Sequence, residues 1–272
     1  MTAATCSAFP VIERTGTMVR QLLIRGMLVG VLAGLCGFAF TWLFGEKQID
    51  LAIAFEDHVR RLAGEAPEPE LVSRAVQSTV GLLTGMLVYG GAFGGILSLV
   101  FAYVHGRIMR LSPRATSAIL GLAGLVVLIL VPQVKYPANP PSVGDPATIG
   151  LRTGLYFEMI ALSVVAAMAG VRIARKLVVR FGRWNAVLAG VGVYMVAMTM
   201  TMLVLPPVDE VPPAFLAVTL WHFRLASIGT NIVVWTVLGL GFGALTERFL
   251  QTVPKGSAFG GVKGRRPLPS SR

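Results

Sequence analysis

The sequence predicts an all-α, polytopic membrane protein with about six transmembrane helices. Hydrophobic residues make up 54% of the 272 residues and charged residues only 14%, against about 25% charged in soluble domains. The apolar residues gather into runs of about 20, which is the length of α-helix that crosses a bilayer. These runs lack the strict apolar/polar alternation of barrel strands, so membrane-spanning helices remain as the predicted structure.

The apolar runs place helices in order along the chain. The expected spans are 22–44, 79–104, 115–132, 154–171, 185–205 and 226–246. The fourth and sixth are interrupted by single polar residues, and the third is short and ends near Pro132, so the count is five to six. Residues 18–250 form the membrane domain. Residues 1–17 are predicted to be an N-terminal extension, and 251–272 a disordered, basic cytoplasmic tail.

Charge decides between five and six spans. With six spans, most of the 24 Lys and Arg residues fall on one side, together with both termini. That side is predicted to be the cytoplasm, because Lys and Arg are concentrated in cytoplasmic loops. The net charge of +11 is therefore an orientation signal and a source of attraction to anionic lipid. It does not indicate a nucleic-acid partner.

The opposite, outer side is predicted to be acidic and ordered. Its acidic residues are Glu46, Asp50, Glu56, Asp57, Glu65, Glu68, Glu70, Asp145, Asp209 and Glu210, and prolines are frequent in the same loops. An ordered acidic mouth would concentrate cations. The alternative is that acids accumulate outside only because bases are kept inside. The first outer loop also predicts an interfacial helix near 48–63, with Glu56/Arg60 and Asp57/Arg61 as i,i+4 pairs.

Glu158 is the strongest single candidate for a functional residue. It lies about five residues into the fourth predicted helix, hence roughly 8 Å below the outer surface. A carboxylate at that depth should face a partner or a wet cavity. Asn231 is expected at a similar depth, and we expect both residues to line an outward-opening cation path. The alternative is a structural Glu158–Arg224 ion pair with no role in transport.

Other side chains near this depth complete the candidate metal site. The full set is Glu158, Asn231, His222, Asp209, Glu210, Met198 and Met202. Met198 and Met202 share a helical face, but thioethers suit soft ions such as Cu(I) better than Co(II). Packing against lipid or the core is therefore the favoured interpretation of the methionines. Glycines at 26, 30 and 34, at 81 and 85, and at 239 and 243 predict close helix contacts.

Catalysis finds little support in the sequence. The chain has three histidines and lacks metalloprotease, nucleophile-elbow and nucleotide-binding motifs. The protein is therefore predicted not to be an enzyme and to hold no permanent cofactor. If transport uses ATP, a separate energising subunit must supply it.

Four stretches resemble the CbtA family of predicted cobalt transporter subunits. They are 64–74 (GEAPEPELVSR), 135–146 (KYPANPPSVGDP), 205–212 (LPPVDEVP) and 223–229 (FRLASIG). The resemblance implies Co²⁺ uptake across a bacterial cytoplasmic (inner) membrane in support of cobalamin biosynthesis. It also implies a small, single-helix, histidine-bearing partner of the CbtB type, and five spans. The competing hypothesis is a non-transporting membrane scaffold or an intramembrane enzyme.

Overall fold

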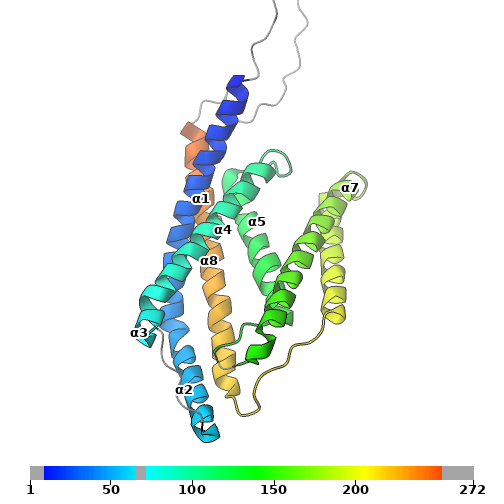
Figure 1. The fold of residues 1–272 in the computed structure, drawn as a ribbon. Helices are drawn as coiled ribbons and strands as arrows, with labels where there is room; N and C mark the ends of the chain where they lie inside the picture. The colour runs from blue at the N-terminus through cyan, green and yellow to red at the C-terminus, as the bar shows by residue number, and fades with distance from the viewer. Residues whose placement is uncertain (1–8, 65–71, 142, 253–272) are drawn as a thin grey trace, which may run out of the picture.

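Long apolar helices running side by side make up the protein in a computed structural model that describes residues 9–64, 72–141 and 143–252 (Figure 1). Within these ranges there is no strand, and the one β-bridge is an isolated pairing of His105 with Met109. The predicted all-α class is therefore confirmed.

Eight α-helices and three short helices of other types follow one another along the described chain. They are α1 (Phe9–Phe44), α2 (Glu46–Ala63), α3 (Arg74–Val76), the π-helix η1 (Gln77–Gly81), α4 (Leu82–Val104), α5 (Pro113–Gly124), the π-helix η2 (Leu125–Leu130), α6 (Val131–Lys135), the 3₁₀-helix η3 (Pro146–Thr148), α7 (Ile149–Val204) and α8 (Ala217–Thr252). Among the described residues, five segments are long and apolar enough to cross a membrane: Thr17–Phe44, Arg74–Val104, Pro113–Lys135, Pro146–Val204 and Ala217–Thr252.

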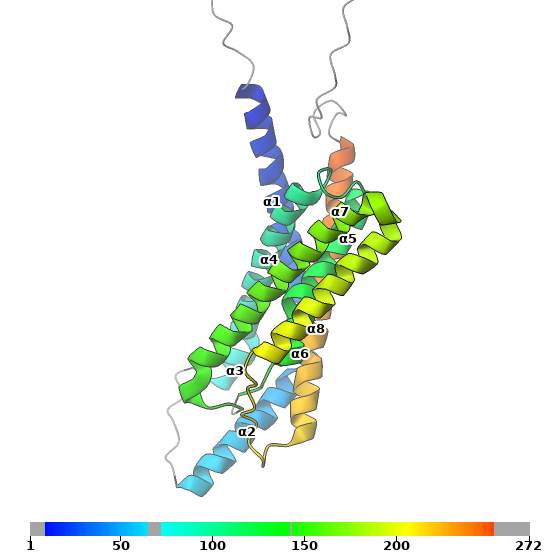
Figure 2. The same cartoon turned by 90° about the vertical axis from the view of Figure 1, so that its right-hand side faces the viewer.

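The longest helix, α7, is a hairpin of two arms. A straight helix of 56 residues would measure roughly 84 Å, almost three times the hydrocarbon thickness of a bilayer. At Gly182 the backbone leaves the helical region, with φ 77° and ψ 167°, a conformation open essentially only to glycine. The chain reverses there (Figure 2). The first arm, 149–181, contains the predicted span 154–171, and the second, 183–204, contains all but the last residue of the predicted span 185–205.

Small residues let the two arms of α7 pack closely. A methyl group added at Gly170 would overlap the carbonyl oxygen of Gly190, and one added at Gly190 would overlap that of Gly170. The hydroxyls of Ser163 and Tyr194 also share a hydrogen bond of 2.8 Å across the hairpin. The hairpin joins the rest of the described bundle through η2 and α6, where Ser163 donates to the carbonyl of Val127 at 2.7 Å.

Helices α1, α4 and α8 form the other part of the bundle. Gly30 of α1 faces Gly90 of α4, so close that a methyl group on either would overlap the other's carbonyl oxygen. Gly26 and Gly94 meet in the same way. The predicted glycine contact of α1 is thus confirmed, whereas Gly85 has no atom near its missing side chain. On α4 the contact uses glycines one to two turns further along.

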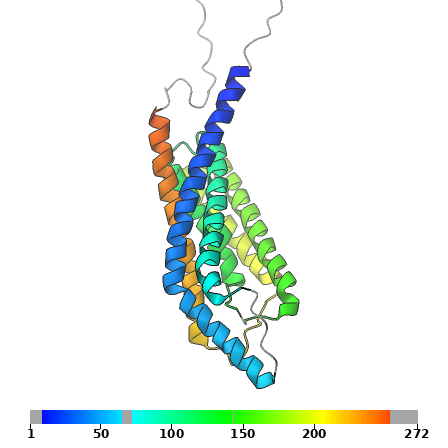
Figure 3. The same ribbon diagram turned by 60° about the vertical axis from the view of Figure 1, so that its left-hand side comes forward.

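The two ends of the bundle differ in their charged side chains. The described ends of α1 and α8 lie at one end with the 105–112 turn and the bend of α7, and we call this the basic end (Figure 1). Helix α2 and the segments 136–148 and 205–216 lie at the other, acidic end (Figure 3). This arrangement matches the predicted sorting of charge. Which membrane face each end contacts stays a prediction.

Helix α2 confirms the predicted helix of the first outer loop and packs at the acidic end. Ala52 is fully buried, and the rings of Phe55 and Phe215 lie 5.0 Å apart, edge to face. Glu56 pairs with Arg60 at 2.9 Å as predicted. Arg61, in contrast, donates to the backbone carbonyl of Asp57 and not to its carboxylate, so the second predicted pair is wrong. The backbone oxygen lies one helical turn before Arg61 and within its reach.

Candidate functional site

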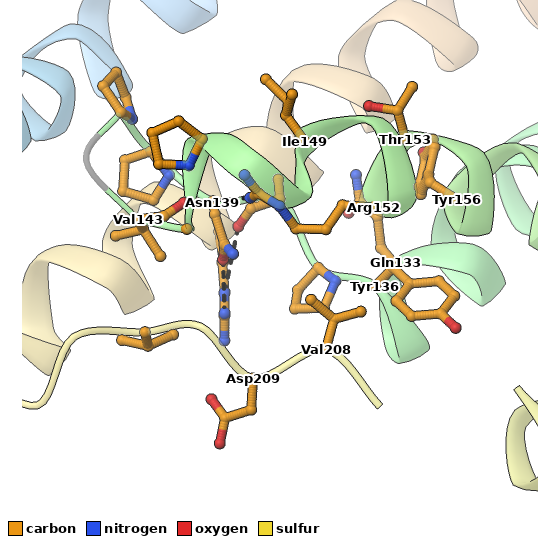
Figure 4. Close-up of a pocket in the computed structure, with 18 residues that line it drawn as sticks. Gln133, Tyr136, Asn139, Val143, Ile149, Arg152, Thr153, Tyr156, Val208 and Asp209 are labelled. Carbon is orange, nitrogen blue, oxygen red and sulfur yellow. Dashed lines mark hydrogen bonds between the residues drawn. The ribbon is translucent and has the colours of Figure 1, made fainter. Parts of the chain in front are cut away.

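A cavity of about 730 Å³ opens at the acidic end, between the start of α7 and the segment that precedes α8 (Figure 4). Its walls come from three parts of the chain: 133–156, 208–211 and Arg224 of α8. Asn139, Val143 and Arg152 lie on one side in Figure 4, and Val208 and Asp209 on the other. The cavity therefore depends on tertiary packing of distant segments.

Prolines and one tyrosine order the walls. Pro137, Pro140, Pro141 and Pro146 line the cavity, and proline fixes φ and so limits the freedom of a loop. The hydroxyl of Tyr136, directly after α6, donates to the carbonyl of Pro206 at 2.8 Å. The 136–146 and 205–212 stretches are thereby tied together.

Glu210 connects the 205–212 stretch to the opposite wall of the cavity through hydrogen bonds and an ion pair. Its carboxylate accepts hydrogen bonds from the hydroxyl of Thr148 at 2.7 Å and from the backbone N–H of Asp145 at 2.9 Å. Arg152 forms an ion pair with it at 3.2 Å. The Thr148 hydrogen bond above all, then the Asp145 N–H and the Arg152 charge, hold the pKa of Glu210 below its usual range. Glu210 is therefore ionised and already satisfied by protein groups.

The two arginines of the cavity differ in how their charge is balanced. Arg152 faces Glu210 and donates to the carbonyl of Asp145 at 3.1 Å. Arg224 donates to the carbonyl of Ala138 at 3.3 Å and to the side-chain oxygen of Asn139 at 2.8 Å, both neutral acceptors. Within the described ranges Arg224 forms no ion pair. Asp209 interacts with it only electrostatically, from a longer distance.

Polar contacts continue from the cavity toward the interior of the bundle. Tyr156, which lines the cavity, lies near Tyr89 of α4. The Tyr89 hydroxyl donates to the side-chain oxygen of Asn231 on α8 at 2.9 Å. One residue earlier on α8, Thr230 shares a 2.8 Å hydrogen bond with Thr41 of α1. A layer of polar side chains thus joins α1, α4 and α8 within the bundle.

The comparison with protein families decides the identity. A family model described as "Probable cobalt transporter subunit (CbtA)" matches residues 19–247, a range that includes most or all of each apolar helical segment. The chain belongs to the CbtA family. No curated protein and no solved structure matches it. The resemblance noted in the four sequence stretches is confirmed. The protein is therefore a multi-pass membrane protein of a family of cobalt transporter subunits, and that family is described by transport and not by catalysis.

The candidate residues expected from the sequence are distributed over several surroundings in this CbtA-family chain. Asp209 lines the cavity and Glu210 lies behind its wall. Asn231 lies in the polar layer of the bundle. Met198 is 3% exposed and packs with Met202 in the apolar cluster around Leu155 and Tyr136. This packing agrees with the favoured interpretation of the two methionines.

Glu158 and His222 lie on exposed surfaces of α7 and α8. Glu158 lies outside the cavity lining but close to Tyr136. Burial raises the pKa of the Tyr136 hydroxyl, and the negative charge of Glu158 is the second, smaller cause of the same shift. Glu158 forms no ion pair with Arg224, whose guanidinium contacts Ala138 and Asn139. The alternative of a structural Glu158–Arg224 pair is thus wrong. The Arg224 guanidinium is instead held by its hydrogen bonds to Ala138 and Asn139.

The described residues contain no group of three or more His, Cys, Asp or Glu side chains that could hold a metal ion. Sequence reasoning did not find Arg152, Asn139, Tyr156 and Tyr89 as site residues. Their signal was weak, since an arginine or a tyrosine near a helix end is also a common interfacial anchor. Only the fold brings them to one cavity and one polar layer.

Proposed function

We propose that the chain is the membrane-embedded subunit of a Co²⁺ uptake system in a bacterial cytoplasmic membrane, which supplies cobalt for cobalamin biosynthesis. The observation that carries the proposal is the family match over residues 19–247, which includes most or all of each apolar helical segment. The separation of charge between the two ends supports an orientation with both termini in the cytoplasm. In that orientation the cavity faces outward as the entry site.

The route inward begins at the cavity and continues through the Tyr89–Asn231 layer. Buried polar side chains in a membrane protein are costly unless they are paired or functional. Tyr89, Asn231, Thr41 and Thr230 provide oxygen atoms at one level of the bundle. Oxygen and nitrogen atoms are suitable transient ligands for a divalent first-row metal ion. The permeating ion therefore passes this level.

The exposed face of α7 at Gly150, Gly154 and Glu158 is the docking surface for a second subunit in this proposal. These three residues recur every four positions, so they share one helical face. All three are exposed, and nothing lies within 4 Å of the missing side chains of the two glycines. A carboxylate on a membrane-facing helix needs a partner, and small residues allow a helix to approach closely. A single-helix, histidine-bearing subunit of the CbtB type fits both needs.

Such a partner would also supply the imidazole ligands of a metal path. The described chain contributes no cluster of metal-binding side chains. A partner histidine beside Glu158 would create a mixed nitrogen and oxygen site, which suits Co²⁺ better than the methionines do. The absence of a nucleotide-binding motif in the sequence leaves the energy source to another subunit or to an ion gradient.

Radiolabelled cobalt uptake tests the proposal. Cells that express the chain together with the single-helix partner should accumulate ⁵⁷Co²⁺ faster than cells that lack the chain. Asn231→Ala should lower the initial rate about tenfold, since a polar group that contacts the ion is worth about 1–2 kcal/mol. Asn185→Ala, which changes an exposed asparagine at the basic end, is the matched control. Equal uptake with and without the chain would favour the scaffold hypothesis.

A further inference from the structure

We infer that the cavity at the acidic end receives the metal as an anionic carboxylate complex and not as a bare hydrated cation. The inference rests on the proposed function and names the form of the substrate at the same site. It follows from the charge of the cavity, from the donors that its arginine presents, and from its size.

The acidic end is less negative than its composition suggests, because several of its carboxylates are already paired. Arg74 forms ion pairs with both Glu46 and Asp50, Arg60 with Glu56, and Arg152 with Glu210. These pairs neutralise one another within the protein. The expected cation-concentrating mouth is therefore weak where the residues are described.

With Glu210 counted, positive and negative charges at the cavity are equal in number, but the two arginines differ in how closely each is paired. The charged side chains that line it are Arg152, Arg224 and Asp209. Glu210 balances Arg152 at 3.2 Å, while Arg224 contacts only the neutral oxygens of Ala138 and Asn139. A guanidinium without a carboxylate at contact distance attracts an anion. Among the described residues, Arg224 is therefore the cavity cation that lacks a carboxylate at ion-pair distance, with Asp209 acting on it from further away.

Arg224 presents donors that match a carboxylate. A guanidinium has five N–H donors in a planar fork, and the Ala138 and Asn139 contacts use two of them. Those two contacts hold the side chain in place, and a held fork binds a carboxylate in a directional, bidentate way. The hydroxyl and amide groups of Thr153, Tyr156 and Gln133 also line the cavity and suit the remaining oxygens of a small polycarboxylate.

The size of the cavity agrees with an organic ligand. About 730 Å³ lies within the usual range for small-molecule sites. A single metal ion needs instead several ligands that converge within about 2 Å of it. The described part of the chain offers no such group. The cavity therefore fits a chelate better than an ion.

The test supplies the same total ⁵⁷Co²⁺ to cells expressing the chain and its partner, either as the chloride or with enough excess citrate to convert it to the anionic complex. Chain-dependent uptake should be faster from the citrate complex. Arg224→Gln should raise the half-saturating concentration of the complex about tenfold, the usual effect of losing one charge-assisted hydrogen bond. Arg224→Lys keeps the positive charge but loses the planar fork of donors. Its half-saturating concentration should lie between those of the unmodified chain and the Arg224→Gln variant.

Asp209→Asn gives an effect of opposite sign. Removing the one carboxylate of the lining should lower the half-saturating concentration of the citrate complex, whereas a bare-cation site would lose affinity. Arg61→Gln, at an exposed position of α2, controls for a general change in surface charge. The amount of folded protein, measured by size-exclusion chromatography, shows that each variant folds.

The outcomes distinguish a failure of the inference about the carboxylate complex from a failure of the proposed cobalt transport. Chain-dependent uptake that citrate suppresses, together with a loss on Asp209→Asn, would overturn the inference and leave cobalt transport intact. If the chain increases uptake from neither source, the proposed function and the inference both fail.

Discussion

Tyr136 connects three parts of the molecule through one side chain. Its ring packs in the apolar cluster with Leu155 and Met198, its hydroxyl donates to Pro206, and Glu158 lies close enough to raise its pKa, with burial as the larger cause. The tyrosine therefore stays neutral at physiological pH.

At the residue scale, Glu158→Gln should abolish association with the single-helix partner without reducing the amount of folded chain. The carboxylate forms no ion pair within the described chain, so its loss leaves no buried charge unpaired. Copurification of the tagged partner and partner-dependent ⁵⁷Co²⁺ uptake measure the effect. Glu56→Gln, which breaks only the surface pair with Arg60, is the control and should retain the partner. Retention of the partner by the Glu158→Gln variant would place the docking surface elsewhere.

Glu210 makes the cavity wall sensitive to acid. Its hydrogen bonds to Thr148 and Asp145 lower its pKa in the folded protein. A lowered folded pKa adds stability above the unfolded pKa, and this stability is lost as the pH falls through the folded pKa. Glu210→Gln should therefore lower the Tm at neutral pH, and the difference from the unmodified protein should vanish in acid.

Thermal unfolding in nanodiscs from neutral to acidic pH measures this difference. Asp57→Asn provides the control, because the nearby Arg61 contacts the backbone oxygen of Asp57 and not its carboxylate. Its Tm difference should stay small and constant with pH. A constant difference for Glu210→Gln as well would show that the carboxylate has no special role in the wall.

At the element scale, the contact between α1 and α4 depends on the absence of side chains. Gly90→Ala should destabilise the protein by about 1–3 kcal/mol, the usual effect of overpacking, because the new methyl group overlaps the carbonyl of Gly30. Gly85→Ala on the same helix meets open space and should be neutral or slightly stabilising. Thermal stability in detergent compares the two, and equal losses would contradict the contact.

The sequence located the helices but underestimated their lengths. The spans predicted at 154–171 and 185–205 end where charged residues begin, yet the helices continue through them to the bend at Gly182. Arg and Lys are good helix formers, so a helix extends past the hydrocarbon region that hydropathy detects. Residues 251–272 of the predicted tail lie mostly outside the described part, while α1 already begins at Phe9 within the predicted extension.

Pro132 is a second position where the helix is longer than the sequence predicts. The third helix is expected to end near this residue, yet helix continues as α6 to Lys135. Proline lacks the N–H of a regular helix turn. The wider π-helical turns of η2, directly before it, change the hydrogen-bond pattern there and let the chain continue. The cavity could not be predicted at all, since it joins 133–156 to 208–211 and Arg224.

For the whole molecule, the expected arrangement is six crossings with both termini in the cytoplasm. In a chain whose two cysteines are replaced by serine, Asp57→Cys should react with an impermeant maleimide in intact cells. Arg180→Cys, near the bend of α7, should react only after the membrane is permeabilised. Mass-shift labelling on gels measures both. Reaction of Arg180→Cys in intact cells would reverse the orientation and place the cavity on the cytoplasmic side.

The touching backbones of α1 and α4 have a consequence for how the protein can open. Where Gly30 meets Gly90 and Gly26 meets Gly94, neither a lipid tail nor a solvated ion has space to pass between the two helices. That flank of the molecule acts as a closed wall. The hairpin of α7, anchored to the other spanning segments mainly through η2 and α6, forms the opposite flank, and a lateral gate would open on that side.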